Sequence, residues 1–287
     1  MSYKKVIFYI FSAILIIVLS CQKFDKEEPI PSYIRISKCI LLSDSISQGS
    51  SQNNISDIWV NIDGNRQGTY EVPVNFPVIA EGNHSLMLRA GVKVNGIAAS
   101  RIIYPFYNSL SFDTTFIPEK QMILTPVFTF KPETKFVWLE NFQNNGFTLD
   151  RTSKSDTILY IKNDTVNTVQ QYGVFYIDAI RQKFQYKSTE KYVLPSNGSE
   201  VFLELDYQCN HPFIVGVFVN KLQQSIETSI ICINPHPQSF NHIYIDLSYI
   251  ISQNTDALDY NIFFGASLES GYTNGEIKID NIKLIHF

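Results

Sequence analysis

Three histidines in the second half of the chain, His211, His236 and His242, lie close in sequence to the carboxylates Asp206 and Asp246. A histidine beside a carboxylate is an arrangement that general acid–base catalysis uses. The sequence, however, has no GxSxG, HExxH or P-loop motif, and these motifs supply a nucleophile, a metal site or a phosphate site. Prolines adjoin His211 and His236, which indicates loop corners. We therefore predict a protein that is not an enzyme.

Binding of a sugar would use other residues of the same region. A sugar ring offers flat apolar faces to aromatic side chains and hydroxyl groups to amides and carboxylates. The candidates are Tyr172, Tyr176, Tyr207, Asp206, Gln208 and Asn210. Tyr207 falls on the apolar face of an alternating stretch, so we expect it at the edge of a core, and we expect Trp138 to be buried. These residues alone do not identify a ligand.

The sequence contains four cysteines, Cys21, Cys39, Cys209 and Cys232. Cys209 and Cys232 each end an apolar segment, and they are either a disulfide pair or two small core residues. No CxxC spacing occurs, which argues against zinc. The first cysteine belongs to a different pattern, at the N-terminus.

Lys4 and Lys5 precede an unbroken apolar run over 6–19, which Ser20 and Cys21 follow. A basic start, a short apolar run and a small residue are typical of a secretory signal. The ending Val-Leu-Ser-Cys resembles the lipobox of bacterial lipoproteins. That resemblance implies that residues 1–20 are a cleaved signal peptide, that Cys21 carries diacylglycerol and a palmitate-type acyl chain, and that the protein is anchored in the outer membrane. The alternatives are an uncleaved anchor helix or an ordinary signal.

Residues 21–32 are predicted to form a tether, because they are charged and then rich in proline. The acidic stretch within 22–28 resembles the export tag of Bacteroidota-type surface lipoproteins, which implies exposure on the cell surface; a solvated tether explains the same residues on either face of the membrane. The formal net charge is −4 and no basic block occurs. Nucleic acid is therefore excluded as a partner.

Short alternating segments with Gly and Pro turns recur from residue 33 to residue 130, which predicts a β-sandwich. Asp63-Gly64 is a strong hairpin signal. The stretch from Trp59 to Val92, with Asp63-Gly64, Gly68 and Gly82, resembles the PEGA-type surface domain. This resemblance implies an immunoglobulin-like sandwich.

Residues 135–287 contain nine or ten further β segments, which predicts a second sandwich of the jelly-roll type and makes the whole chain all-β. The stretch 201–207 alternates, with Phe202, Glu204 and Asp206 on its second face. We expect that face to contact water. Between the two sandwiches, the aromatic residues Tyr104, Phe106 and Tyr107 either fill the gap, which we favour, or contact a partner protein.

Three short motifs, Leu-Glu-Asn-Phe at 139–142, the segment 240–247 and Ile-Asp-Asn-Ile-Lys-Leu at 279–284, resemble the jelly-roll carbohydrate-binding modules. In that family an acid near the first strand and an Asp on the closing strand bind a structural Ca²⁺. By position these are Glu140 and Asp280, whose carboxylates suit a hard cation. The alternative is two solvated carboxylates at the edges of strands.

The whole chain resembles a group of Bacteroidota-type surface lipoproteins of unassigned function, a resemblance that implies location and fold but no chemistry. We predict a membrane-anchored surface protein with a non-catalytic binding role, namely glycan binding through the C-terminal jelly roll. The alternative is a structural or adhesive scaffold that binds another surface protein.

Overall fold

The computed structural model describes residue 3 and residues 28–144, 146–164 and 170–287. Apart from residue 3, the predicted signal peptide, Cys21 and the first part of the tether lie outside these residues. Within this part of the chain, no helix is long and apolar enough to cross a membrane. The strands β1 to β21 account for nearly all of its regular structure, and the helix α2 (Ser248–Gln253) has six residues. The prediction of an all-β chain is confirmed.

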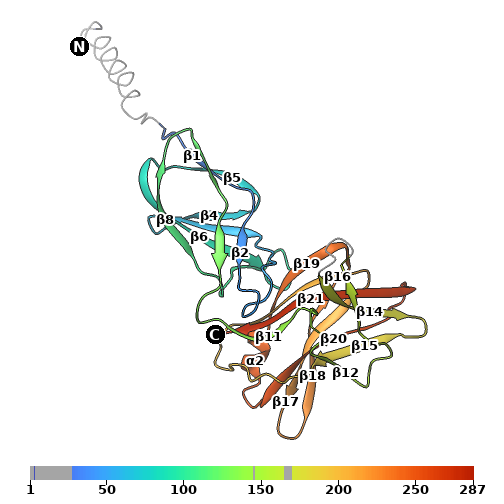
Figure 1. Cartoon of the computed structure of the whole chain (residues 1–287). Helices are drawn as coiled ribbons and strands as arrows, with labels where there is room; N and C mark the ends of the chain where they lie inside the picture. Colours follow the sequence, from blue (N-terminus) through green and yellow to red (C-terminus); the bar gives the residue numbers. More distant parts are fainter. Residues whose placement is uncertain (1–2, 4–27, 145, 165–169) are drawn as a thin grey trace.

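The first half of the chain forms three sheets around one hydrophobic core (Figure 1). Strand β1 pairs with β5 and β9, β2 pairs with β10, and β6 pairs with β3, β7 and β8, while β4 extends that sheet beyond β3. The strands are β1 (Ser32–Ile36), β2 (Ile40–Leu42), β3 (Asp57–Ile62), β4 (Asn65–Glu71), β5 (Val74–Val78), β6 (Gly82–Lys93), β7 (Arg101–Ile103), β8 (Leu110–Phe116), β9 (Gln121–Leu124) and β10 (Val127–Thr129).

The predicted hairpin at Asp63-Gly64 is confirmed. Ile62 pairs with Asn65 across a two-residue turn, and both turn residues have positive φ, 49° for Asp63 and 78° for Gly64. Positive φ at both central positions suits a type I′ turn, whose twist matches that of the flanking strands. The side chain of Asp63 accepts hydrogen bonds from the Ser85 backbone N–H and from His84, and so attaches the turn to β6.

The second half forms two packed sheets. One has the order β13-β14-β21-β16-β19, with β11 also paired to β21, and the other has the order β12-β15-β20-β17-β18. The strands are β11 (Lys135–Glu140), β12 (Leu149–Arg151), β13 (Tyr160–Asn163), β14 (Gln171–Asp178), β15 (Lys183–Ser188), β16 (Val201–Cys209), β17 (Phe213–Asn220), β18 (Ser225–Ile233), β19 (His236–Asp246), β20 (Asp259–Ser267) and β21 (Asn274–His286). We call the sheet that contains β16, β19 and β21 the junction sheet.

The inner face of the junction sheet packs against the other sheet of the same sandwich. Leu203, Leu205, Ile243 and Ile279 belong to this core and are at most 4% exposed. Tyr207 and Trp138 also lie in it, which confirms the two burial predictions. Because successive side chains of a strand point to opposite faces, Phe202, Glu204 and Asp206 face the other way.

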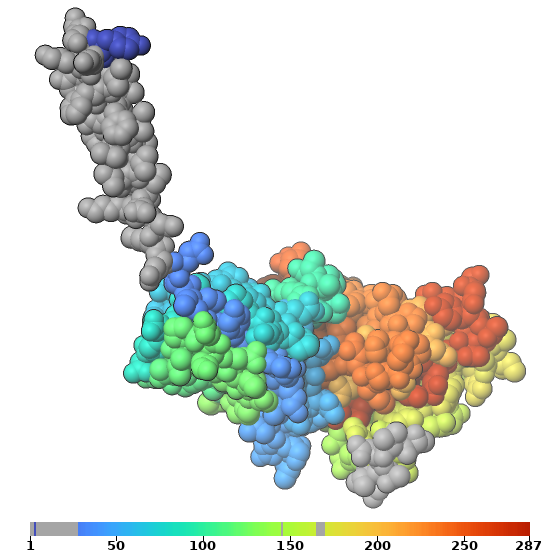
Figure 2. Space-filling model, turned by 90° about the horizontal axis from the view of Figure 1, so that it is seen from above, coloured from blue at the N-terminus to red at the C-terminus, as the bar shows by residue number. Residues whose placement is uncertain are grey.

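The outer face of the junction sheet contacts the first half of the chain (Figures 1 and 2). Phe202, Tyr244 and Ile285 belong to the hydrophobic core of the first sandwich. The ring of Phe202 lies 5.4 Å from that of Tyr104 and 5.9 Å from that of Phe106, measured between centroids. The aromatic patch at 104–107 therefore fills the junction, as we favoured. The expectation of a wet outer face is wrong for β16, since Glu204 is fully buried and Asp206 is 6% exposed.

Candidate functional site

A pocket of about 440 Å³ lies where the loop before β3 meets the outer face of the junction sheet. We call it the junction pocket. Both sandwiches contribute to its wall, and polar side chains predominate in it. It is lined by Gln52, Asn53, Asn54, Asp164, Gln170, Tyr172, Asp206, Ser239, Phe240, Asn241, His242 and Asp280. Its size lies within the range of about 300–1,000 Å³ that is typical of small-molecule sites.

Three neighbouring strands place the ionisable groups of the pocket. Asp206 on β16 pairs directly with His242 on β19 and, on its other side, with Asp280 on β21. Their sequence neighbours Leu205, Ile243 and Ile279 point into the core, so the three polar side chains must emerge on the outer face. The register of the sheet thus brings together residues that are up to 74 positions apart.

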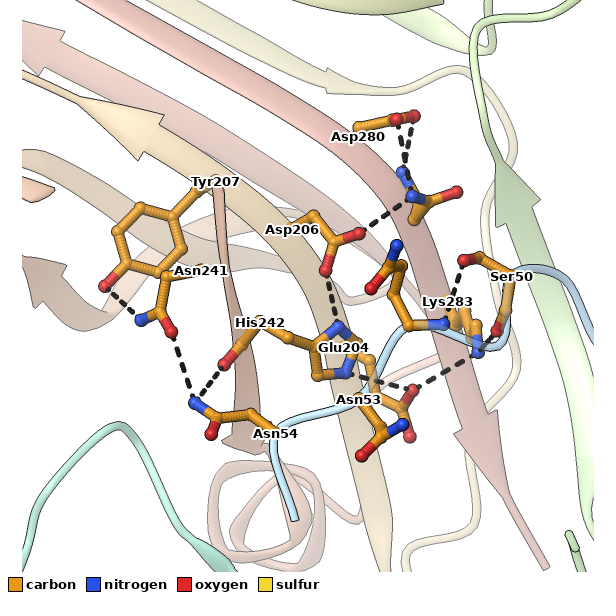
Figure 3. A network of polar contacts seen from close by, with 12 residues as sticks. Ser50, Asn53, Asn54, Glu204, Asp206, Tyr207, Asn241, His242, Asp280 and Lys283 are labelled. Carbon is orange, nitrogen blue, oxygen red and sulfur yellow. Dashed lines mark hydrogen bonds and ion pairs between the residues drawn. The ribbon is translucent and has the colours of Figure 1, made fainter. Parts of the chain in front are cut away.

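Asp206 and His242 form a buried ion pair (Figure 3). Nδ1 of His242 lies 2.6 Å from Oδ1 of Asp206, and the two residues are each 6% exposed. Burial alone would lower the pKa of His242, but the hydrogen bond to Asp206 and the negative charges of Asp206 and Glu204 outweigh it and raise the pKa to about 9. His242 is therefore an imidazolium at neutral pH, with both charges held under the pocket.

Among the described residues, the hydrogen-bond donors around Asp280 are all amides. Oδ1 accepts from the backbone N–H of Asn281, and Oδ2 accepts from Nε2 of Gln170 at 3.0 Å and from Nδ2 of Asn281 at 3.3 Å. Burial raises its pKa to about 7; the amide hydrogen bonds oppose that rise, and the carboxylates of Asp206 and Glu140 add to it. A carboxyl group that is 2% exposed and titrates near neutrality is typical of functional sites.

The loop residue Asn54 closes the pocket from the side of the first sandwich (Figure 3). Its Nδ2 donates to Oδ1 of Asn241 at 3.2 Å and to the backbone oxygen of His242 at 3.1 Å, and its backbone N–H donates to the Tyr244 hydroxyl. Asn241 in turn donates to the Tyr207 hydroxyl at 3.1 Å. These bonds fix the amide groups on the rim, so little side-chain entropy remains to be lost when a ligand binds.

Two aromatic rings form the opposite wall. Tyr172 on β14 and Phe240 on β19 meet edge to face, with their centroids 5.5 Å apart and an angle of 66° between the ring planes. Lys278 lies 5.6 Å from the centroid of the Tyr172 ring, and it also lies 3.7 Å from Glu276, which balances its charge. The pocket therefore combines apolar ring surface with amides and carboxylates.

A second buried network lies beside the pocket and joins the two sandwiches. Oε1 of Glu204 accepts a 2.5 Å hydrogen bond from the Tyr104 hydroxyl, while Oε2 lies 3.5 Å from Nε2 of His242 and 3.6 Å from Nζ of Lys283. Lys283 also donates to the backbone oxygen of Ser50 at 2.6 Å. Burial opposes ionisation of Glu204, but the positive charges of Lys283 and His242 and the hydrogen bond from Tyr104 lower its pKa.

The two predicted calcium ligands lie on neighbouring strands. Glu140 on β11 pairs with Ile282 on β21, two residues beyond Asp280. Both oxygens of Glu140 accept hydrogen bonds, from the backbone N–H of Phe142 and from the backbone N–H and hydroxyl of Thr148. These bonds close the loop after β11, and in the described part of the chain no three His, Cys, Asp or Glu side chains are grouped as a metal would need. The Ca²⁺ assignment stays a prediction.

The remaining predicted residues are separated. Tyr172 and Asp206 line the pocket, whereas the ring of Tyr176 lies 5.8 Å from that of Tyr160, with an angle of 60° between the ring planes. His211 lies elsewhere, with Nδ1 2.6 Å from the Pro212 backbone oxygen and Nε2 accepting from the Glu269 N–H.

Gln208 contacts Lys278, and Asn210 accepts from the Glu276 N–H. His236 lies 2.9 Å from the Ser239 backbone oxygen, and Asp246 accepts from the Ser248 N–H. Cys39, Cys209 and Cys232 are free thiols, and Cys209 is buried in the core.

Sequence reasoning missed Asn54, Gln170, Asn241 and Phe240 as pocket residues. Asn54 belongs to a polar loop that precedes Asn241 by nearly 190 positions, and nothing in the local pattern connects the two. A usable signal was the presence of acids and a histidine on the outward positions of two alternating strands, 201–207 and 242–247.

No family model and no curated protein sequence matches the chain. About half of it is similar in structure to β-sandwich modules of carbohydrate-binding proteins, at low identity. The xylanase 10B CBM22-1–GH10 modules of Clostridium thermocellum are 12% identical over 53% of this chain and 28% of that chain, with a TM-score of 0.40. A CBM29-2 mutant complexed with mannohexaose is 13% identical over 52% of this chain and 88% of that chain, with a TM-score of 0.34. The enzymatically active domain of tailspike protein 4 of bacteriophage CBA120 is 17% identical over 51% of this chain and 20% of that chain, with a TM-score of 0.38.

Proposed function

We propose that this protein binds a saccharide in the junction pocket and catalyses no reaction there. The observation that carries the proposal is the composition of the pocket wall. Fixed amides from Asn54, Gln170 and Asn241, the carboxylate of Asp280 and the ring of Tyr172 surround one concave space. Sugar hydroxyl groups both donate and accept hydrogen bonds, and the C–H faces of a sugar ring pack on aromatic surface, so this set of groups complements a sugar.

The location and the finer fold assignments are part of the same proposal. The second sandwich would be a jelly roll and the first an immunoglobulin-like domain. Lipidated Cys21 would attach the chain to the outer membrane, with the pocket available to glycans outside it. Each buried CH₂ contributes about 0.8 kcal/mol, so a single acyl chain binds a membrane only marginally. Stable attachment therefore needs two or more chains. Replacement of Cys21 by Ser should release the protein from the membrane fraction; retention there at unchanged mass would contradict the anchor.

Saccharide binding is tested with the chain from Glu28 onward on a glycan array, followed by calorimetry with each hit. We expect Tyr172→Ala to weaken binding at least tenfold, about 1.4 kcal/mol, because the ring forms one wall of the pocket. Tyr176→Ala is the matched control: it lies four residues along β14, on the same face of that strand, and does not line the pocket. It should bind as the unaltered chain does.

An array without reproducible hits would contradict the proposal, and so would equal losses in the two tyrosine variants. Capture of a specific surface protein by crosslinking on cells, together with a silent array, would favour the adhesive scaffold instead.

A further inference from the structure

The buried polar side chains at the junction do not balance in charge. Glu204, Asp206 and Asp280 are acids, and the cations that face them are His242 and Lys283. His242 pairs with Asp206, and Lys283 pairs with Glu204. Among the described residues, no cation lies within 4 Å of Asp280, whose hydrogen-bond donors are the neutral amides of Gln170 and Asn281.

The sheet register makes this imbalance more costly. Asp206 and Asp280 lie directly opposite each other on β16 and β21, and like charges in that position destabilise a sheet. The side-chain amide of Asn281 bridges them, donating to Oδ2 of Asp206 at 2.8 Å and to Oδ2 of Asp280 at 3.3 Å. An amide relieves the repulsion of two carboxylates but cannot neutralise it.

The uncompensated acid borders the junction pocket. The described lining residues include Asp164, Asp206 and Asp280 and one cation, His242, which pairs with Asp206, but no Lys or Arg. The nearest lysine outside the lining, Lys278, is balanced by Glu276. A ligand group in contact with Asp280 would therefore find an anionic, largely desolvated environment, where an opposite charge interacts much more strongly than it does in water.

We infer that the saccharide bound in the junction pocket carries a protonated amine, as an amino sugar does, and that Asp280 is the residue that binds the ammonium group. This inference rests on the proposed saccharide function and names its ligand class. The ammonium group would supply the positive charge that the described neighbours of Asp280 do not supply, while the amides and Tyr172 hold the sugar ring. The same charge distribution would repel sugars that carry a carboxylate.

The test uses the chain from Glu28 onward and methyl glycosides of glucosamine, galactosamine and mannosamine, each as the free amine and as the N-acetylated form. Calorimetry at pH 6.5 gives the affinity for each glycoside. We expect at least one amine form to bind ten times more tightly than its N-acetylated partner. Asp280→Asn should abolish this preference, whereas Asp150→Asn, a carboxylate of β12 outside the pocket, should preserve it.

Three results would overturn the inference: equal affinity for the two forms, a preference for the N-acetylated form, or Ca²⁺ binding that depends on Asp280 without any amine preference. Lack of binding to all six glycosides would also overturn it. The glycan array would then show separately whether the protein binds any saccharide. Asp280→Asn removes a like-charge contact but also replaces an acceptor oxygen by an NH2 group that meets amide donors, so its melting curve is measured first to establish that the variant is folded. A folded variant that keeps the amine preference would refute the role of Asp280.

Discussion

Replacement of Lys283 by Met tests whether the two sandwiches are joined by a buried ionic network. Lys283 is 1% exposed and Glu204 is fully buried. The substitution keeps the side-chain length but removes the charge 3.6 Å from Glu204 and the hydrogen bond to Ser50. Removal of one partner from a buried pair leaves the other charge uncompensated, which costs about 3–5 kcal/mol. We expect a loss of that size in the free energy of unfolding.

The assay is urea unfolding of the chain from Glu28 onward, with the m-value checked for constancy. In a chain of this size, 1 kcal/mol corresponds to roughly 2–4 °C in melting temperature, so heating should show a fall of at least about 6 °C. Lys278→Met is the control, because it makes the same change on the same strand at a partly exposed pair with Glu276, where the effect should stay below about 1 kcal/mol.

A double substitution separates the ionic contact from packing. If Glu204→Gln is added to Lys283→Met, the combined loss should be smaller than the sum of the two single losses, by roughly 0.5–3 kcal/mol. Additive losses, or a Lys283→Met protein within about 0.5 kcal/mol of the unaltered chain, would show that the reasoning is wrong and that the network contributes little.

Three further predictions concern other parts of the second sandwich. The pKa of His242 is raised from 6.5 to about 9 and that of Asp280 from 3.8 to about 7; both groups bind protons more tightly when folded, so the free energy of unfolding should fall through Asp280 as pH rises from about 4 to 7 and through His242 as pH rises from 6.5 to 9, and Asp280→Asn should remove the first of these falls. Gly216→Ala should destabilise by about 1–3 kcal/mol in urea unfolding, because a Cβ there would lie 2.5 Å from the Thr228 backbone oxygen, while Gly146→Ala, with nothing within 4 Å, should be neutral. If Glu140 and Asp280 share a Ca²⁺ ion, EDTA should lower the melting temperature and Asp280→Ala should abolish that response; an unchanged melting curve would leave both as ordinary carboxylates.

The sequence predicted the direction in which the side chains of a strand point better than it predicted what packs against them. Alternation over 201–207 assigned Leu203, Leu205 and Tyr207 to a core correctly, because period-two patterning reports which side chains face the partner sheet. It could not report what covers the other side, so the buried positions of Glu204 and Asp206 were missed. Cover comes from residues about 100 positions earlier, and no local pattern encodes such a contact.

The predicted strand boundaries were wrong where a proline interrupts a continuous apolar run. Residues 122–130 look like one strand, but Pro126 lies between β9 and β10, which belong to different sheets. Proline cannot donate to a ladder, so the pairing changes there. Strands β8 and β15 were not recognised either. Their polar positions hold Asp, Thr, Gln and Lys, which do not mark the ends of a strand as turn residues do.

The shared wall of the junction pocket has a consequence for how such a protein can be divided or recombined. A gene fragment that encoded residues 135–287 alone would expose Phe202, Tyr244 and Ile285 to water and would lack Gln52, Asn53 and Asn54. Its product would have an exposed apolar face and an incomplete binding site. In evolution the two sandwiches should therefore be inherited as one cassette, and pairs of substitutions that preserve the contact between residues 50–54 and 241–244 should accumulate together.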